Sequence, residues 1–381
     1  MHSRTGDAIH VSELSMNLAA LENKVSLLAS FDSPSNNDLN FLTNNKNVIL
    51  VPFIRSKGKY FKSRNLSLLL QCFKLAKEAH PDIIYERNFS CKIGSILSFL
   101  LGIPLIVEIN GVMDEEMLLK NGFIFRKKAI VSNWLKKIFY RSASTIIAVS
   151  PMIKEKMIDT YHIESSKVEV VPNGADVDLF SPLDKNIARR KLGLDSNLKY
   201  LCFVGNLASW QGLDFLVSSA PFILEQEPDI RFLIVGDGVM RNELESMTND
   251  NNTVDMFVFT GNVPFKDVPL YINSSDICIA LFNEGRKCSP LKVFEYLACG
   301  KPVIITDLGG DTEIFRGIDS VFFLESRQPK SLADLISHVL PHVDNQKRVI
   351  EARNFIVEKY AWENTAQRVV DICNKAMRNK Y

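Results

Sequence analysis

The chain of 381 residues lacks any apolar run that reaches the roughly 18 residues of a membrane-spanning helix. Its first twenty residues, Met1 to Ala20, have neither the basic start nor the apolar centre of a signal peptide. No low-complexity stretch and no internal sequence repeat interrupts the chain. These absences predict a protein that stays in the cytoplasm.

Cysteine is sparse and unpaired in sequence, because no two cysteines form a C-x-x-C motif. Their odd number, seven, and their scatter fit a reducing compartment and argue against a zinc site. They are Cys72, Cys91, Cys202, Cys278, Cys288, Cys299 and Cys373.

An excess of charge is also missing, since 45 basic residues stand against 44 acidic ones. Nothing in this balance attracts nucleic acid, and no nucleic-acid partner is expected. The distribution is uneven, however: up to Asp178 there are 22 basic and 18 acidic residues, and the remainder holds 23 and 26. The first half is therefore the part expected to meet an anionic surface.

Short β-branched runs alternate with segments long enough for helices, which predicts parallel sheets of an α/β protein. The length suits two domains. In the first half the predicted strands are Val25–Ala29, Val48–Pro52, Ile83–Tyr85, Leu105–Ile109 and Thr145–Val149. In the second half they are Tyr200–Val204, Phe232–Val235, Phe257–Phe259, Ile277–Leu281, Val303–Thr306 and Val321–Leu324.

The two doubly wound domains are expected to join within Val170–Pro182, where Pro, Asn, Gly and Asp crowd together as in turns. We place the boundary at Asp178, which gives an N-terminal domain over 1–178 and a C-terminal domain over 179–361. A last helix over 362–381 has one apolar face. This helix can pack on either domain, including back on the N-terminal one.

The segment "SPLKVFEYLACGKPVIITD" predicts a helix that begins with Ser289 as its cap and Pro290 at its first helical position, and that ends at Gly300. The free N–H groups and the dipole of a helix start favour an anion. A phosphate is therefore expected at this end of the helix.

Five motifs in one order resemble the retaining nucleotide-sugar glycosyltransferases of family 4. They are "VVPNGADVDLFSP", "FVGNLASWQGLDFLVSSA", "FLIVGDGVMRNELE", "FTGNVPFKDVPLYINSSDICIALF" and "SPLKVFEYLACGKPVI". The resemblance is strong in the second half and weak in the first. It implies the GT-B fold, in which two Rossmann-like domains face each other across a cleft and the second domain holds the nucleotide sugar.

The resemblance implies a donor site in the second domain. Gly205 ends a strand and would let the ligand approach the backbone. Glu295 matches the second acid of the family's E-x7-E element, which binds the ribose; the alternative is a helix-surface pair with Lys292. Ser289, Pro290, Leu291 and Lys292 would face the diphosphate, and Gly261, Asn262 and Val263 the base.

Two departures from the family pattern concern charge. The first acid of E-x7-E falls on Lys287, and the Arg and Lys that usually hold the diphosphate fall on Asn206 and Gln211. Both replacements remain hydrogen-bond donors but carry no charge. We expect the missing charge to come from Arg286, Lys287 and Lys292.

In the first domain, Asn110 follows a predicted strand where many family members have a histidine. Asn110 cannot act as an acid or base near neutral pH, although it can hydrogen-bond a sugar hydroxyl. Glu108, two residues earlier, could orient the acceptor hydroxyl or only satisfy buried backbone. These two residues are the candidate catalytic groups.

The amino terminus resembles the family's first glycine loop, with Gly6 and Asp7 in the turn of the donor side and His10 in the following helix. Only five residues precede Gly6, whereas the family has a full strand there. That strand is central in a doubly wound sheet, so its absence would expose its neighbours. His10 by itself is more often a residue of a helix face than a ligand.

Two basic segments with interleaved aromatics suggest contact with an anionic membrane surface. Arg55–Arg64 has five basic residues, and Lys120–Arg141 has seven and no acidic one. The alternative is a solvated helix that packs its aromatics on the first domain. The protein could then be peripheral on the inner face of the cytoplasmic membrane.

The sequence therefore predicts transfer of a sugar from a nucleoside diphosphate sugar to a hydroxyl of a glycan or lipid-linked acceptor, with retention. No cofactor and no metal are expected, since no Asp-x-Asp stands where the fold would place a ligand. A nucleotide-sugar epimerase or a non-catalytic GT-B scaffold are the alternatives.

Overall fold

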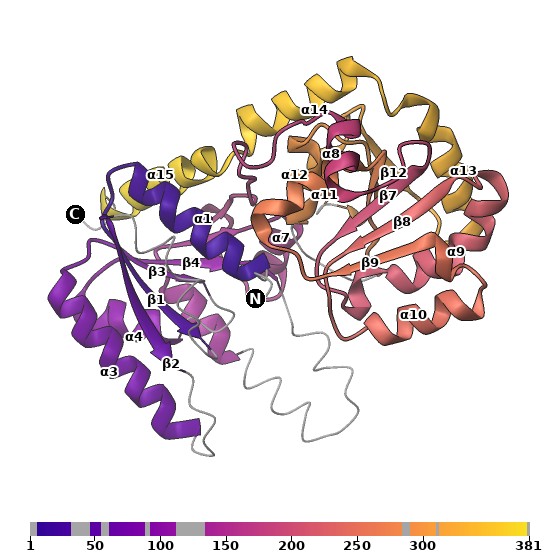
Figure 1. Ribbon diagram of the computed structural model, residues 1–381. Helices are drawn as coiled ribbons and strands as arrows, with labels where there is room; N and C mark the ends of the chain where they lie inside the picture. Colours follow the sequence, from indigo (N-terminus) through magenta and orange to yellow (C-terminus); the bar gives the residue numbers. More distant parts are fainter. Residues whose placement is uncertain are drawn as a thin grey trace. The chain divides into compact units, whose positions relative to one another are not determined.

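The computed structural model describes residues 6–31, 46–54, 61–87, 92–111, 134–283, 290–309 and 312–378 (Figure 1). The chain divides into two compact units. The N-terminal unit is built mainly from the described residues between 10 and 172 together with 365–378, and the C-terminal unit from those between 173 and 364. The division after Pro172 falls inside the turn-rich segment Val170–Pro182.

The C-terminal unit contains a six-stranded parallel sheet in the order β12-β11-β10-β7-β8-β9. The strands are β7 (Lys199–Val204), β8 (Ile230–Val235), β9 (Phe257–Gly261), β10 (Ile277–Ala280), β11 (Val303–Thr306) and β12 (Val321–Leu324). The order reverses between β7 and β10, which is the point where doubly wound sheets bind ligands. All six strands lie where the sequence predicts them.

Both faces of this sheet are covered by helices (Figure 1). Along β7, Leu201 and Phe203 pack toward one layer, whereas Tyr200 and Cys202 pack toward the other. Alternate residues point to opposite faces of a strand, so burial of both faces requires apolar residues at nearly every position. The first layer contains α9 (Leu213–Gln226), α10 (Arg241–Asp250) and α13 (Pro329–Val339), and the second contains α11 (Val268–Ser274), α12 (Leu291–Ala298) and α14 (Gln346–Lys359).

A buried ion pair fixes α8 (Lys185–Leu192) to the start of the sheet. Asp276 accepts hydrogen bonds from Arg189 Nη2 at 2.6 Å, Lys185 Nζ at 2.7 Å and the Tyr200 backbone N–H at 2.7 Å. The Arg189 and Asp276 side chains are only 4% and 5% exposed. A buried charge that loses its partner is strongly destabilising, so this cluster holds the two elements together.

The N-terminal unit contains a four-stranded parallel sheet, β3-β4-β5-β6, and a separate parallel pair, β1-β2. The strands are β1 (Val25–Phe31), β2 (Val48–Ile54), β3 (Ile84–Arg87), β4 (Leu105–Ile109), β5 (Thr145–Ala148) and β6 (Val168–Val170). The sequence did not predict β6, which has only three residues. The described helices of this unit include α1 (Gly6–Ala20), α3 (Phe61–Ala79), α4 (Lys92–Leu101) and α7 (Pro151–Asp159).

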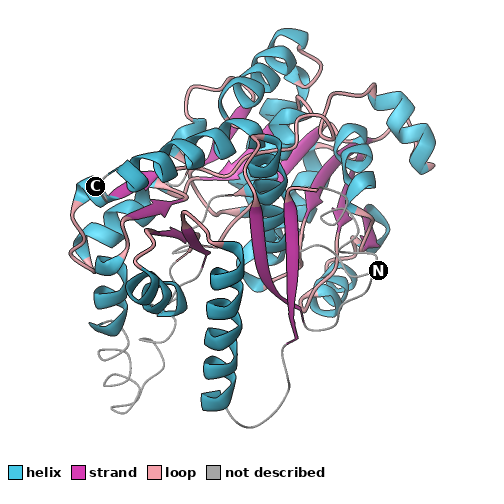
Figure 2. Cartoon of the chain, turned by 90° about the vertical axis from the view of Figure 1, so that its left-hand side faces the viewer, coloured by secondary structure: helices cyan, strands magenta, loops and turns pink. Residues whose placement is uncertain are grey.

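Helix α15 (Trp362–Arg378) packs on the N-terminal sheet along most of its length. Ala366 and Val369 share a buried cluster with Leu14 of α1 and Ile106 of β4. The opposite face of the four-stranded sheet is covered by a cluster that includes Ile153 of α7. Figure 2 shows these helices and strands by type.

The described strands of the N-terminal unit form two sheets, the pair β1-β2 and the four-stranded sheet. In β2, Val48 is buried but its neighbour Ile49 is 58% exposed, as expected for a strand covered on one face only. No described helix is both long enough and apolar enough to cross a membrane.

We expect Asp276→Asn to lower the free energy of unfolding of the C-terminal unit by about 3 kcal/mol, because Arg189 would keep a buried charge without its counter-ion. Urea denaturation followed by tryptophan fluorescence measures the change. Asp255→Asn, at an exposed position of the same unit, is the matched control and should have almost no effect. Equal stability of both variants would contradict the structural role of the pair.

Candidate functional site

Three glycines line the carboxyl edge of β7, β8 and β9. Gly205, Gly236 and Gly261 have φ angles of 145°, 131° and 68°, which residues with a side chain rarely adopt. The Gly236 N–H donates to the Gly261 carbonyl at 3.0 Å, and a Cβ on Gly236 would lie 2.0 Å from the Gly205 carbonyl oxygen. These positions therefore favour glycine because of their φ angles and, at Gly236, because the Gly205 carbonyl oxygen occupies the place of a Cβ. Gly236 was not among the predicted site residues, although the G-D-G of "VGDGVM" signals it.

Lys292 brings a positive charge to this edge at the topological switch point. From the first turn of α12, its Nζ donates to Gln211 Oε1 at 2.8 Å and lies 3.8 Å from the centre of the Phe203 ring. A Cβ on Gly205 would be 3.0 Å from the same Nζ. Three of the residues predicted to bind the sugar donor therefore lie close together: Gly205, Gln211 and Lys292.

The start of α12 differs from the prediction by one residue. The helix begins at Leu291, and Pro290 occupies the cap position with φ −80° and ψ 84° and no side-chain cap hydrogen bond. The prediction that Pro290 is the first helical residue is wrong, because this ψ is not helical. Three further predicted donor residues, Arg286, Lys287 and Ser289, lie outside the described residues.

Tyr296 fixes α12 against β7. Its hydroxyl oxygen accepts a hydrogen bond from the Val204 N–H at 2.8 Å, and burial raises the pKa of this hydroxyl well above its usual range. The preceding residue, Glu295, is 8% exposed and sits three residues after Lys292 on the same helix. Tyr296 was not among the predicted site residues. Its position directly after Glu295, the candidate ribose-binding acid, is the sequence feature that could have pointed to it.

The remaining predicted donor residues lie along the same edge. Asn206 is exposed and lies against Gly238, where an added Cβ would meet Asn206 Oδ1 at 2.4 Å. After β9, Asn262 is exposed and Val263 packs against the core. Gln211 is only 3% exposed, and its side-chain oxygen accepts the hydrogen bond from Lys292.

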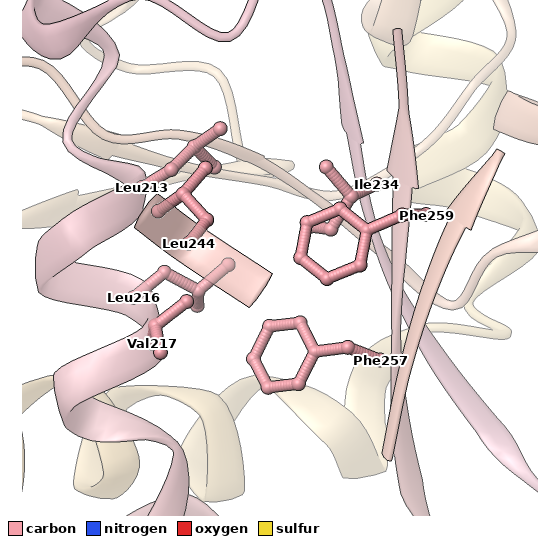
Figure 3. A pocket seen from close by; sticks show the side chains of 7 residues that line it. All are labelled: Leu213, Leu216, Val217, Ile234, Leu244, Phe257 and Phe259. Carbon is pink, nitrogen blue, oxygen red and sulfur yellow. The ribbon is translucent and has the colours of Figure 1, made fainter. Parts of the chain in front are cut away.

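A small apolar pocket in the C-terminal unit is not a ligand site. It lies between α9, α10 and the strands β8 and β9 (Figure 3). Its lining is entirely apolar, and it has no space for a water-sized sphere. The lining residues are Leu213, Leu216, Val217, Ile234, Leu244, Phe257 and Phe259. It is a packing gap within the core.

Glu108, a predicted catalytic residue, is the centre of a buried polar cluster in the N-terminal unit. Its carboxylate lies 3.0 Å from His10 Nε2, accepts from Arg87 Nε at 2.8 Å, and accepts a short hydrogen bond from the Tyr85 hydroxyl. A carboxylate only accepts, so His10 Nε2 must carry the hydrogen. His10 and Glu108 are 2% and 1% exposed, which makes His10 a buried anchor of α1.

The cluster keeps Glu108 ionised. Burial by itself raises the pKa of this carboxyl, but the interactions with His10, Arg87 and Tyr85 outweigh it and lower the pKa to about 2. Burial and the charge of Glu108 raise the pKa of the Tyr85 hydroxyl well above its usual range. An acid held this firmly is a poor proton carrier, so Glu108 is better suited to positioning than to proton transfer.

The other predicted residues of the N-terminal unit occupy element ends. Asn110 follows β4 directly and is half-buried. Gly6 and Asp7 lie in the first turn of α1, and the division of the chain groups these two residues with the C-terminal unit. Among the residues that the structure describes, no group of three His, Cys, Asp or Glu side chains could hold a metal ion. That the reaction needs no metal remains a prediction.

We expect Glu108→Gln to reduce the stability of the N-terminal unit by roughly 3 kcal/mol at pH 7, from a pKa lowered from 4.5 to about 2. A carboxyl group whose pKa is lower in the folded chain than in the unfolded chain stabilises the fold at pH values above the unfolded-state pKa. This stabilisation is lost as the pH falls toward the folded-state pKa. The difference between wild type and variant should therefore shrink between pH 4.5 and pH 2. Denaturation at several pH values measures it, with exposed Glu155→Gln as control. A difference independent of pH would contradict this explanation.

Two family profiles match the chain in succession. Residues 5–179 match Glycosyltransferase Family 4, and residues 184–354 match Glycosyl transferases group 1. A galactosyltransferase of Escherichia coli, UDP-Gal:alpha-D-GlcNAc-diphosphoundecaprenol alpha-1,3-galactosyltransferase, is 26% identical over 83% of both chains. An uncharacterized glycosyltransferase of Methanocaldococcus jannaschii is 27% identical over 61% of this chain, and the match spans 60% of that relative.

Solved structures share the fold at low sequence identity. A glycosyltransferase of Rickettsia africae has a TM-score of 0.77 at 18% identity, over 97% of this chain and 95% of that one. HepE of Anabaena in complex with UDP has a TM-score of 0.75 at 19% identity, over 96% of both chains. These likenesses confirm two Rossmann-like domains of the GT-B fold. The two matching profiles, which together span residues 5–179 and 184–354, show that this chain belongs to the group 1, family 4 glycosyltransferases.

Proposed function

We propose that this protein transfers a sugar from a nucleoside diphosphate sugar to a hydroxyl of a glycan or lipid-linked acceptor, with retention at the anomeric carbon. The observation that carries the proposal is the ammonium of Lys292 held over the glycine edge at the switch point, with Glu295 on the same helix. Lys292 suits the diphosphate, Glu295 suits the ribose hydroxyls, and the glycines offer backbone groups to the ligand.

The chemistry asks the protein mainly to stabilise the leaving group. The bond between the anomeric carbon and the diphosphate oxygen breaks, the acceptor oxygen bonds to that carbon, and the acceptor proton passes to the departing phosphate. Lys292 would neutralise charge that grows on the diphosphate, at a position fixed in advance by Gln211. No protein base is needed on this route.

In the N-terminal unit we assign Asn110 a hydrogen bond to a sugar hydroxyl, and Glu108 the role of positioning residue. Glu108 holds the end of β4 through its side-chain partners on α1 and β3, and Asn110 follows two residues later. Asp7 and Gly6 would meet the donor at the start of α1.

The substrates of similar proteins support this choice. The Escherichia coli relative takes its acceptor on diphosphoundecaprenol, and HepE has been crystallised with UDP-glucose. We therefore propose a step of cell-envelope polysaccharide synthesis, with the enzyme peripheral on the inner face of the cytoplasmic membrane.

A titration of the protein with UDP-, GDP-, ADP- and dTDP-sugars tests the donor site. We expect one nucleotide to bind, and Glu295→Ala to weaken that binding at least tenfold through loss of the ribose contact, about 1.5 kcal/mol or more. Calorimetry gives both values, and product analysis with and without an acceptor separates transfer from epimerisation. Absence of binding to every donor in folded protein would favour the scaffold alternative.

Two variants rank the contributions of Lys292 and Gln211 to binding of the donor's diphosphate. Lys292→Met should weaken donor binding about tenfold to a hundredfold, because it removes a charged hydrogen bond worth roughly 1.5–3 kcal/mol. Gln211→Ala should cost less, since only the support of Lys292 is lost. Lys347→Met, an exposed position of α14, serves as control. The opposite ranking of Lys292 and Gln211 would refute this assignment.

A further inference from the structure

Arg241, which is not one of the predicted site residues, lies at the carboxyl end of β9. It is the first residue of α10, directly after the loop 236–240 that follows β8. A Cβ added to Gly261, the last residue of β9, would be 3.2 Å from Arg241 Nη1. Gly261, Asn262 and Val263 are the residues that the family resemblance assigns to the nucleobase. A guanidinium group therefore lies beside the strand end where the base is expected.

Three neighbours hold this guanidinium in one orientation. Its Nε donates a hydrogen bond to Glu245 Oε1 at 2.8 Å, one turn further along α10. Asp237 Oδ2, in the loop before the helix, is 3.7 Å from Nη1, and the centre of the Phe259 ring lies 6.0 Å from the guanidinium carbon. Because these contacts come from the loop, the helix and β9, the group is in place before a ligand binds. A preorganised donor loses less entropy on binding than a mobile one.

The guanidinium is held but not enclosed. The Arg241 side chain is 29% exposed, Asn262 is exposed, and Val239 in the loop before the helix is 89% exposed. An arginine has five N–H donors and no acceptor. Among the described residues its side chain forms one hydrogen bond, through Nε, so the donors of Nη1 and Nη2 can serve a ligand.

The charges around Arg241 favour a neutral part of a ligand over a phosphate. Asp237 and Glu245, at 3.7 Å and 2.8 Å, offset the positive charge of the guanidinium and would repel a diphosphate. Lys292 supplies positive charge at Gly205 of β7, and β8 separates that strand from β9. Neighbouring strands are about 4.8 Å apart, so the two positions are roughly 10 Å apart. This spacing suits the diphosphate and the base of one nucleotide.

A group that only donates hydrogen bonds discriminates between bases. Uracil, thymine and guanine present a carbonyl oxygen, which accepts from a guanidinium. Cytosine and adenine carry an amino group at the corresponding ring position, so two donors would face each other and neither would have an acceptor. Sites built to hydrogen-bond one substrate group reject analogues that lack it for this reason.

We propose that Arg241 selects donors whose base presents a carbonyl oxygen, namely uracil, thymine or guanine, in preference to cytosine or adenine. The inference rests on the proposed function and names the class of nucleotide that the donor site accepts. Arg241 is then a specificity-determining residue, whereas Lys292 contributes alike to every nucleoside diphosphate.

Calorimetric titration of the full-length chain with two matched pairs of nucleotides tests the assignment. UDP and CDP differ in the oxo or amino group at C4 of the base, and inosine diphosphate and ADP differ in the same way at C6. Wild type should bind the oxo member of at least one pair about tenfold more tightly than the amino member. Arg241→Met should reduce this ratio to below about threefold by weakening the oxo nucleotide alone, and Arg241→Lys should retain part of it because the ammonium still donates.

Two controls separate the base from the rest of the nucleotide. Inorganic pyrophosphate, which has no base, should bind Arg241→Met as it binds wild type. Arg231→Met changes an arginine at the amino end of β8, where Nη1 donates to the backbone carbonyls of Pro228 and Ile230. This variant should leave the ratio of the two affinities unchanged.

The proposal is overturned if wild type binds both members of each pair equally or prefers the amino member, or if Arg241→Met weakens both members alike, as a purely structural role would. Thermal unfolding verifies that each variant is folded. Glu245→Gln, which keeps the guanidinium and weakens its anchor, is the milder variant and should lower the ratio less. A preference for oxo nucleotides without sugar transfer would refute the proposed function only, and sugar transfer without this preference would refute the role of Arg241 only.

Discussion

The burial of both faces of the C-terminal sheet is the constraint on which the candidate site depends. When helices cover both faces, every strand interior must be apolar, and polar contact with a ligand is left to the carboxyl edge. There Gly205, Gly236 and Gly261 replace side chains with backbone, because the Gly236 chain passes too close to the Gly205 carbonyl for a Cβ. The edge is therefore closely packed backbone, with the Lys292 ammonium beside Gly205.

The same geometry places a positive charge beside the loop after β7, whose residues 205–212 carry none. Lys292 comes from α12, across the switch point, and reaches the place where Gly205 leaves the sheet. Its helix is held by Tyr296, whose hydroxyl caps the last N–H of β7. A cation on a fixed helix is better preorganised than one on a loop, and Gln211 adds a neutral partner that does not cancel its charge.

In the N-terminal unit a charged group is buried, whereas some large apolar side chains are exposed. Glu108 is enclosed by partners from α1 and β3 and anchors β4. On the outer side of the sheet, Phe99 and Trp134 remain in solvent although their helices are well packed. A buried acid whose hydrogen-bond partners are all in place stabilises a fold, whereas exposed aromatic side chains are typical of interaction surfaces.

Most of the parallel strands of both units could be predicted from the sequence, since short β-branched runs and helix-length spacers are local patterns, and motif order nominated Gly205, Lys292 and Glu295 as donor-binding residues. It missed β6, whose three residues carry too little signal, and it began α12 one residue early because Pro290 reads as a first helical residue. Which side chains contact each other could be seen only in the folded chain. Lys292 and Gln211 are 81 positions apart, and His10 and Glu108 are 98 apart. Such pairings follow from strand order and burial, which depend on the whole chain rather than on any one segment.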